Sequence, residues 1–143
     1  MVLARKKDGT WKFCVDYRKI NSVTQRDVYP IPRIDESLDA LGGSQWFTTL
    51  DLLTGYWQVE LSEDAREKSA FVTRSGLWQF KVLPFGLTSA PATFERLMET
   101  IFRGLQWKTL LIYLDDIIIF SKDTDTHRER LTEVLGSLRK AGP

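Results

Sequence analysis

The order of apolar and polar positions along the chain predicts an α+β fold. Short runs rich in β-branched and aromatic residues, separated by Gly, Pro, Asp and Ser, are typical of strands joined by turns. Other stretches repeat their apolar residues every three or four positions, which is the period of an amphipathic helix. We therefore expect an antiparallel sheet backed by helices, with strands near residues 2–4, 11–15, 46–52, 58–61, 69–73, 77–82, 110–114 and 117–120.

Helix signals occupy the segments between these strands. The predicted helices are residues 33–41 before Gly42–Gly43, a segment from Thr88 or Ser89 to Leu105, and residues 123–140 with Thr124 or Asp125 as the N-cap. Residues 63–68 are mostly acidic and basic and are expected to form an exposed link between two strands. The helices should cover the sheet with their apolar faces.

The most unusual stretch is the apolar run from Leu110 to Phe120, which Asp115 and Asp116 interrupt. Unpaired charges buried in such a run would cost roughly several kcal/mol per ion, so something must compensate them. A β-hairpin with both carboxylates at the turn is the simplest backbone solution. Turn chemistry alone is one explanation, because Asp is common in turns. The absence of a glycine from this turn instead favours a bound cation.

A third carboxylate lies at the end of another predicted strand. Asp51 is the next-to-last residue of the run Trp46–Leu52, and Asp115 follows 64 residues later. If that strand pairs beside the hairpin, the three side chains converge at one edge of the sheet. Such a cluster suits hard divalent cations, and polymerases and nucleases use two of them. Spacing alone does not choose between these reactions.

Composition and charge narrow the class of protein. The 143 residues are 43% hydrophobic and 27% charged, which is typical of one globular domain with a core. The net charge is +1, but residues 1–33 alone carry +5. A basic arm beside a carboxylate-bearing body suits a polyanion, although a solvated basic face explains the same bias. Cys14 is the single cysteine, so no internal disulfide forms, and neither a membrane helix nor a signal peptide is visible.

Basic residues near the N-terminus favour a polymerase over a nuclease. Arg5, Lys6 and Lys7 crowd one predicted loop, with Lys12 and Arg18 beyond it. This cluster suits the neutralisation of a triphosphate, for which a nuclease has less use.

Aromatic residues add a second hint. Tyr56 follows Asp51 closely enough to stand near the sugar of a bound nucleotide, although a core position is the alternative. Phe85–Gly86 offers a flat ring and an unhindered backbone against which a base pair could rest. His127 is the only histidine, and its charged surroundings predict a surface residue rather than a ligand.

Four segments, in order and spacing, resemble the reverse transcriptase of gypsy-type long-terminal-repeat retrotransposons. They are residues 5–21, 47–56, 83–94 and 113–116. The resemblance implies a right-hand polymerase fold, with fingers at about residues 1–25 and 59–88 and palm at about residues 26–58 and 89–143. No thumb, ribonuclease H or integrase segment is expected within the chain.

The resemblance also implies roles for single residues. Asp51, Asp115 and Asp116 take the positions that hold two Mg²⁺ or Mn²⁺ ions, with the Leu52 carbonyl as a further ligand. Tyr56 takes the position of a steric gate against a ribose 2′-hydroxyl. The implied nucleotide-binding residues are Lys6, Lys7, Lys12, Thr54, Gly55, Tyr56, Phe85 and Gly86, and Tyr113 and Leu114 would support the primer end. Lys12, often Arg in the family, and Trp57, commonly His, depart from its pattern.

The implied function is that of an RNA-directed DNA polymerase domain, a nucleotidyltransferase that adds deoxynucleotides to a primer 3′ end. Expected partners are an RNA or DNA template with its primer, deoxynucleoside triphosphates, and the thumb and ribonuclease H of a polyprotein. A cytoplasmic virus-like particle is the expected location. Two alternatives stay open: a catalytically silent fragment that binds nucleic acid or a partner, and a metal nuclease.

Overall fold

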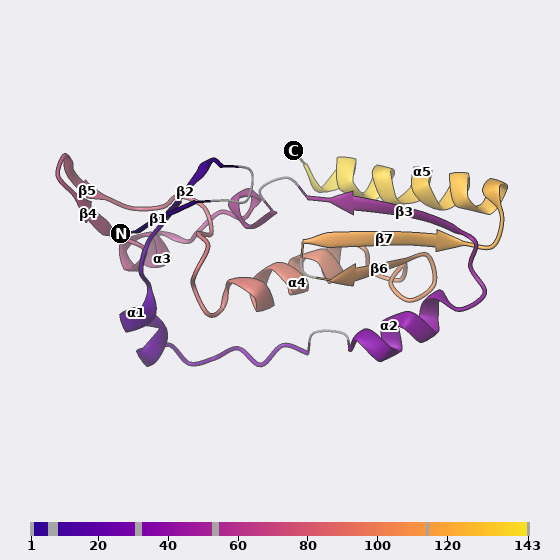
Figure 1. The fold of residues 1–143 in the computed structure, drawn as a ribbon, viewed down its shortest axis with the longest axis horizontal. Helices are drawn as coiled ribbons and strands as arrows, with labels where there is room; N and C mark the ends of the chain where they lie inside the picture. The colour runs from indigo at the N-terminus through magenta and orange to yellow at the C-terminus, as the bar shows by residue number, and fades with distance from the viewer. Residues whose placement is uncertain (1, 6–8, 31–32, 53–54, 114, 143) are drawn as a thin grey trace. The chain divides into compact units, whose positions relative to one another are not determined.

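A computed structural model describes residues 2–5, 9–30, 33–52, 55–113 and 115–142 of the chain (Figure 1). The chain divides into two compact units. Met1–Asp27 and Thr54–Ala90 form the first unit, and Val28–Leu53 and Pro91–Pro143 form the second. Their boundaries therefore fall at residues 27, 53 and 90. The family resemblance implies limits between fingers and palm near residues 25, 58 and 88.

The second unit is built on a sheet in which β7 (Asp116–Ser121) lies between β3 (Trp46–Asp51) and β6 (Leu110–Tyr113). Both pairings are antiparallel. The predicted hairpin of β6 and β7 is confirmed, with one difference. Asp116 is the first residue of β7 rather than a turn residue, because it pairs with Tyr113 and with Asp51.

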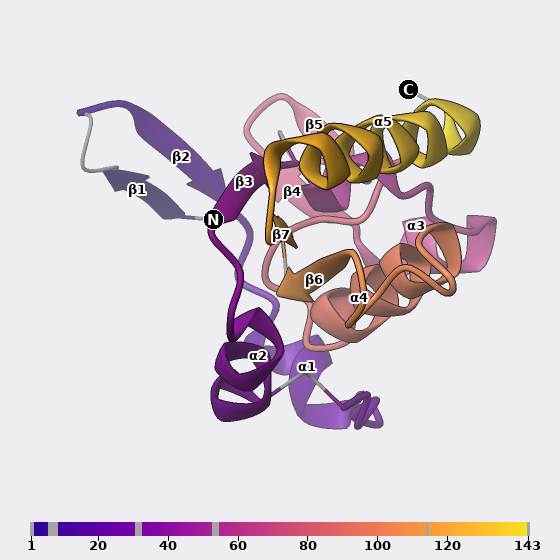
Figure 2. The ribbon, with the colours of Figure 1, turned by 90° about the vertical axis from the view of Figure 1, so that its right-hand side faces the viewer.

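Helices cover the two faces of this sheet unequally. Figure 2 shows α4 (Ala90–Ile101) and α5 (Thr124–Ala141) on one face, whereas α2 (Ile34–Leu41) lies on the other. The face under α4 and α5 carries the alternating side chains of both hairpin strands, which are at most 1% exposed: Leu110, Ile112, Ile117 and Ile119. Phe94, Met98 and Phe102 fill the same core from α4 and the residue after it. Burial of each such side chain stabilises the fold by about 1.5–3 kcal/mol.

His127 joins α5 to the sheet through hydrogen bonds, and its predicted surface position is wrong. Its side chain is 9% exposed. Its Nε2 lies 2.8 Å from Thr48 Oγ1 on β3, and its Nδ1 lies 3.0 Å from Ser121 Oγ on β7. The Ser121 hydroxyl donates to the Asp123 carbonyl at 2.9 Å, so it accepts from Nδ1–H, and Nε2 accepts from Thr48. The charged neighbourhood of His127 in the sequence did not indicate this burial, because one of its polar partners, Thr48, lies 79 residues away along the chain.

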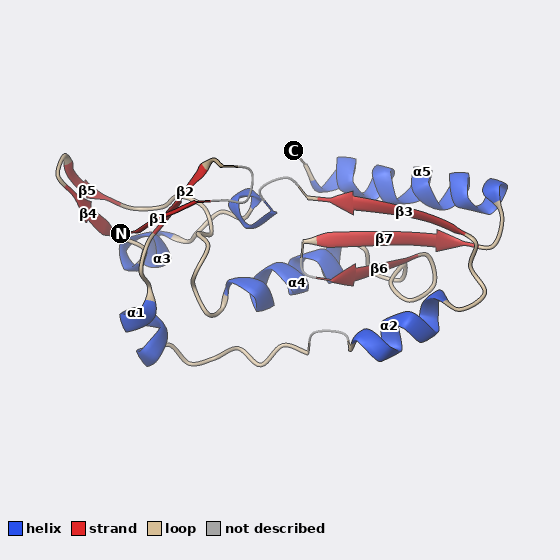
Figure 3. Cartoon of the chain, in the orientation of Figure 1, coloured by secondary structure: helices blue, strands red, loops and turns tan. Residues whose placement is uncertain are grey.

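The first unit consists of two small hairpins and short helices, drawn in red and blue in Figure 3. Its elements are β1 (Val2–Arg5), β2 (Trp11–Cys14), α1 (Arg18–Val23), the 3₁₀ helix η1 (Gly55–Gln58), α3 (Glu63–Lys68), β4 (Phe71–Thr73) and β5 (Gly76–Trp78). β1 pairs with β2 and β4 with β5, both antiparallel. Tyr17 is buried, and its hydroxyl donates to the Ser69 carbonyl at 3.0 Å. Burial raises the pKa of Tyr17 to about 12.

Several local predictions differ from the structure. The helix expected to reach Leu105 ends at Ile101, and the strand expected at residues 77–82 ends at Trp78. Residues 58–61 form no strand, and only the isolated bridge between Glu60 and Val82 remains there. The predicted link at residues 63–68 is the helix α3, since Glu63 and Asp64 favour a helix N-terminus. The N-cap of α5 is Asp123, whereas Thr124 or Asp125 was predicted, and the Asp123 carboxylate accepts from the Thr126 backbone N–H at 2.9 Å. That hydrogen bond lowers the pKa of Asp123.

No helix in the described ranges is both long and apolar enough to span a bilayer.

We expect Thr48→Val to destabilise the chain by about 1–2 kcal/mol, because it leaves the buried Nε2 of His127 without its hydrogen-bond donor. Urea unfolding measures the change. Thr49→Val is the matched control, since Thr49 is exposed and alternates to the other face of the same strand. Equal losses from both substitutions would show that the hydrogen bond to His127 does not anchor α5.

Candidate active site

The register of β3 against β7 brings two of the predicted carboxylates directly opposite each other. Asp51 and Asp116 are paired at the end of the two strands. The Leu52 amide donates to the Asp115 carbonyl at 3.2 Å, which makes residues 52 and 115 a hydrogen-bonded position. Because hydrogen-bonded and non-hydrogen-bonded positions alternate, Asp51 and Asp116 occupy a non-hydrogen-bonded position, where facing side chains are closest.

The third carboxylate belongs to the same corner. Asp115 lies in the turn between β6 and β7 and is partly buried, whereas Asp51 and Asp116 are exposed. The hydrogen bond from Leu52 ties this turn to the end of β3. Backbone pairing therefore fixes the corner that carries all three carboxylates.

The paired carboxylates lie on the sheet face that α4 and α5 leave open. An apolar cleft of about 240 Å³ adjoins Asp116 on this face. Asp116, Tyr113 and Ile118 line it from the sheet, and Leu38 and Leu41 line it from α2. Tyr113, predicted to support the primer end, is 39% exposed beside Asp116.

The chemistry of these donors fits a divalent cation. Carboxylate oxygens are the ligands that Mg²⁺ and Mn²⁺ prefer. Like charges directly opposite each other in an antiparallel pair are destabilising, and a cation between them would offset that repulsion. Within the described ranges, no group of three or more His, Cys, Asp or Glu side chains is close enough to hold a metal ion. The three-carboxylate metal site, with Leu52 as a further ligand, therefore stays a prediction.

An aromatic cluster in the first unit contains two of the predicted nucleotide contacts, Tyr56 and Phe85. The rings of Tyr56 and Phe85 lie 5.2 Å apart at 52°, and Trp57 meets Phe85 at 5.7 Å. Gly55 is buried at the start of η1. Ring contacts of this kind hold Tyr56 and Phe85 in one arrangement.

Asn21 supports this cluster, although no role is predicted for it from the sequence. Its side-chain amide donates to the Gly86 carbonyl at 2.8 Å and accepts from the Thr88 backbone N–H at 3.0 Å. Gly86 has φ +98°, a conformation that disfavours any side chain. Asn21 thus holds the segment that follows Phe85, and its only signal was its place at the end of a family-like stretch.

The predicted basic cluster is placed only in part. Lys6 and Lys7 lie outside the described residues, as do Thr54 and Leu114. Lys12 lies in β2, opposite Ala4 of β1, and its side chain is outside the described part of the structure. Arg18 pairs with Asp16 at 2.6 Å, and this contact holds the pKa of Asp16 well below its usual range. Arg18 is thus engaged with a neighbouring carboxylate.

Comparison with solved structures identifies the fold. The chain matches a foamy viral protease-reverse transcriptase in complex with RNA/DNA hybrid, with a TM-score of 0.86 and 23% identity over 97% of this chain and 18% of that chain. The fold is therefore that of the fingers and palm of a right-hand polymerase, as predicted.

Comparison of sequences identifies the family. The pattern described as "Reverse transcriptase (RNA-dependent DNA polymerase)" matches residues 4–143. Over 92% of this chain, the sequence is 46% identical to the retrovirus-related Pol polyprotein from transposon opus of Drosophila melanogaster. Over 89% of this chain, it is 40% identical to the corresponding polyprotein from transposon gypsy of the same organism. It covers 13% and 12% of those relatives. The chain belongs to the reverse transcriptase family, and its resemblance to gypsy-type elements is confirmed.

We expect Asp116→Asn to raise the Tm of the full chain by about 1–3 °C in the presence of a chelator, because it removes the like-charge repulsion across the strand pair. Differential scanning calorimetry measures the shift. Glu60→Gln is the control, since Glu60 is exposed and faces Val82 rather than a second acid. A lower Tm for Asp116→Asn would mean that Asp51 and Asp116 do not repel each other as paired.

Proposed function

We propose that this chain is the catalytic region of an RNA-directed DNA polymerase that adds deoxynucleotides to a primer 3′ end. The observation that carries the proposal is the pairing of Asp51 with Asp116 on the open face of the sheet, next to Asp115. Membership of the reverse transcriptase family supports the same reaction. The chain spans a small part of its relatives, so the activity of a whole polyprotein is part of this proposal.

The three carboxylates would hold two Mg²⁺ or Mn²⁺ ions. Such ions, when bound, activate the 3′ hydroxyl and stabilise the charge on the leaving pyrophosphate. The chain's own contribution is rigidity. Strand pairing holds Asp51 and Asp116, and the Leu52–Asp115 hydrogen bond holds the turn, so the charges need little reorganisation during the reaction.

The first unit would supply the nucleotide contacts. Tyr56 rests against Phe85, so its ring is fixed and suits the exclusion of a ribose 2′-hydroxyl. Gly86 leaves the backbone beside Phe85 without a side chain, and Asn21 holds that backbone through the Gly86 carbonyl. The basic residues Lys6, Lys7 and Lys12 would neutralise the triphosphate.

The proposed partners follow from this reaction. A primer annealed to an RNA or DNA template would pass over the open face of the sheet, and deoxynucleoside triphosphates would be the second substrate. The foamy viral relative was solved with RNA/DNA hybrid, which supports such a partner. The thumb and ribonuclease H of a polyprotein would hold the duplex together with this chain.

Primer extension on an RNA template with Mg²⁺ or Mn²⁺ tests the proposal. We expect incorporation by the chain, with a thumb supplied in trans, and a loss of at least about 100-fold in Asp116→Asn, because several kcal/mol of transition-state stabilisation are removed. Glu129→Gln, an exposed position on α5, should retain the activity.

Three results would contradict the proposal. Extension that survives Asp116→Asn would remove the carboxylates from the mechanism. Binding of template and primer without incorporation would favour a catalytically silent fragment. Cleavage of nucleic acid without added deoxynucleotides would favour a metal nuclease.

A further inference from the structure

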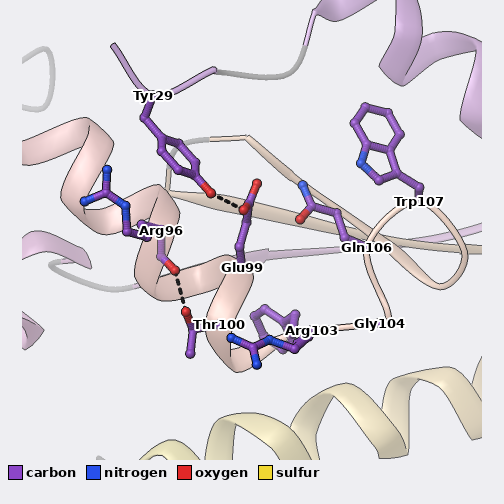
Figure 4. Close-up of a pocket in the computed structure, with 9 residues that line it drawn as sticks. Tyr29, Arg96, Glu99, Thr100, Arg103, Gly104, Gln106 and Trp107 are labelled. Atoms are coloured by element: carbon purple, nitrogen blue, oxygen red, sulfur yellow. Dashed lines mark hydrogen bonds between the residues drawn. The ribbon is translucent and has the colours of Figure 1, made fainter. Parts of the chain in front are cut away.

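A polar pocket in the second unit is separate from the paired carboxylates. It has a volume of about 500 Å³ and is formed by the C-terminal half of α4, by Tyr29 and by the loop that leads into β6 (Figure 4). This loop enters β6 at Leu110, whereas Asp115 follows the other end of the strand, after Tyr113. The volume lies within the range of small-molecule sites.

An indole on this loop is held in an unfavourable backbone conformation. Trp107 has φ +69° and is the one non-glycine residue of the described chain with a positive φ. Its backbone N–H donates to the Leu110 carbonyl at 2.9 Å, which fixes the turn. The side chain is still 42% exposed at the pocket. A bulky residue is kept in this region only where the surrounding structure determines it, and such positions cluster at binding sites.

Two guanidinium groups give the pocket a positive character. Arg103 lines it and has no ion-pair or side-chain hydrogen-bond partner among the described residues. Arg96 lies over the Tyr29 ring at 4.9 Å, which holds it at the opposite side from Trp107 (Figure 4). Arginine in this setting suits a phosphate, whose oxygens it can contact through a planar fork.

The centre of the pocket carries a hydroxyl, a carboxylate and an amide, which form hydrogen bonds rather than add positive charge. The Tyr29 hydroxyl donates to a carboxylate oxygen of Glu99, and this hydrogen bond raises the pKa of Tyr29. Figure 4 shows Glu99 and Gln106 extending into the space between Tyr29 and Trp107. A carboxylate accepts hydrogen bonds, so it suits the exocyclic amino group of a base, while the Gln106 amide can both donate and accept.

We propose that this pocket binds one nucleotide of a single-stranded nucleic acid, with the base against the Trp107 indole, its amino group toward Glu99, and the phosphate toward Arg103. Stacking on an exposed aromatic ring beside cationic side chains is how single strands are generally bound. The site takes no part in nucleotide transfer, so it extends the proposed function and does not depend on it. An acidic peptide is the competing ligand for the same two arginines.

A mononucleotide tests the site locally. We expect cytidine 5′-monophosphate to move the indole N–H signal of Trp107 in a nitrogen–proton NMR spectrum of the full chain, with that signal assigned by its loss in Trp107→Phe. Uridine 5′-monophosphate lacks the amino group and should bind about tenfold more weakly. The same shift should persist in Asp116→Asn, which separates this site from the paired carboxylates.

A labelled single-stranded hexanucleotide then separates stacking from charge. In fluorescence anisotropy, Arg103→Ala should reduce the slope of log K against log salt by about 0.7, the value for one lost phosphate contact on a single strand. Trp107→Ala should weaken binding severalfold with the slope unchanged, and Trp107→Phe should restore it. Arg139→Ala, an exposed position on α5, is the matched control for lost charge and should leave both quantities as they were.

Several outcomes would overturn the proposal. One is an indole signal of Trp107 that stays in place at millimolar cytidine monophosphate. Another is an equal loss of affinity in Arg139→Ala and Arg103→Ala, which would mean diffuse charge attraction. A third is a glutamate-rich peptide that moves the indole signal more strongly than the nucleotide, which would assign the pocket to a protein partner.

Discussion

The antiparallel register of β3 against β7 is the constraint on which both the core of the second unit and the candidate active site depend. It places Asp51 opposite Asp116 and, one residue further along, Leu50 opposite Ile117. Because side chains alternate between faces, a slip of one residue would turn the carboxylates toward α4 and α5 and the core residues toward the open face. The buried isoleucines of β7 thus specify the position of the acids. Strand β7 thus contributes core side chains on one face and Asp116 of the candidate active site on the other.

Hydrogen bonds from α5 reinforce this register from the covered face. His127 contacts Thr48 on β3 and Ser121 on β7, so one imidazole links the helix to both strands. On the open face the opposed carboxylates work against pairing, since like charges repel across the strands. Contacts on the covered face therefore stabilise the strand pairing that brings the two acids together on the open face, where the proposed reaction would need them.

The local pattern of apolar and polar residues was sufficient to predict the strands around the acids and the long helices, because each of these segments has its own strand or helix periodicity. The resemblance supplied the fold and the family, which the comparisons confirm. Prediction from the sequence failed for residues whose position depends on contacts with distant parts of the chain. His127 is buried by contacts 79 and 6 residues away along the chain, and Asn21 reaches Gly86 across 65 residues. The strand expected at residues 58–61 is missing because its alternating pattern has no neighbour beyond one bridge.

The most direct test of the carboxylate site is paramagnetic broadening by Mn²⁺ in the NMR spectrum of the full chain. Substoichiometric Mn²⁺ should broaden the amide signals of residues 50–52 and 115–117 before those of other residues, and the selective loss should disappear in the double variant Asp51→Asn with Asp116→Asn. Selective broadening that persists in the double variant, or that centres on another part of the chain, would show that these acids do not form the metal site.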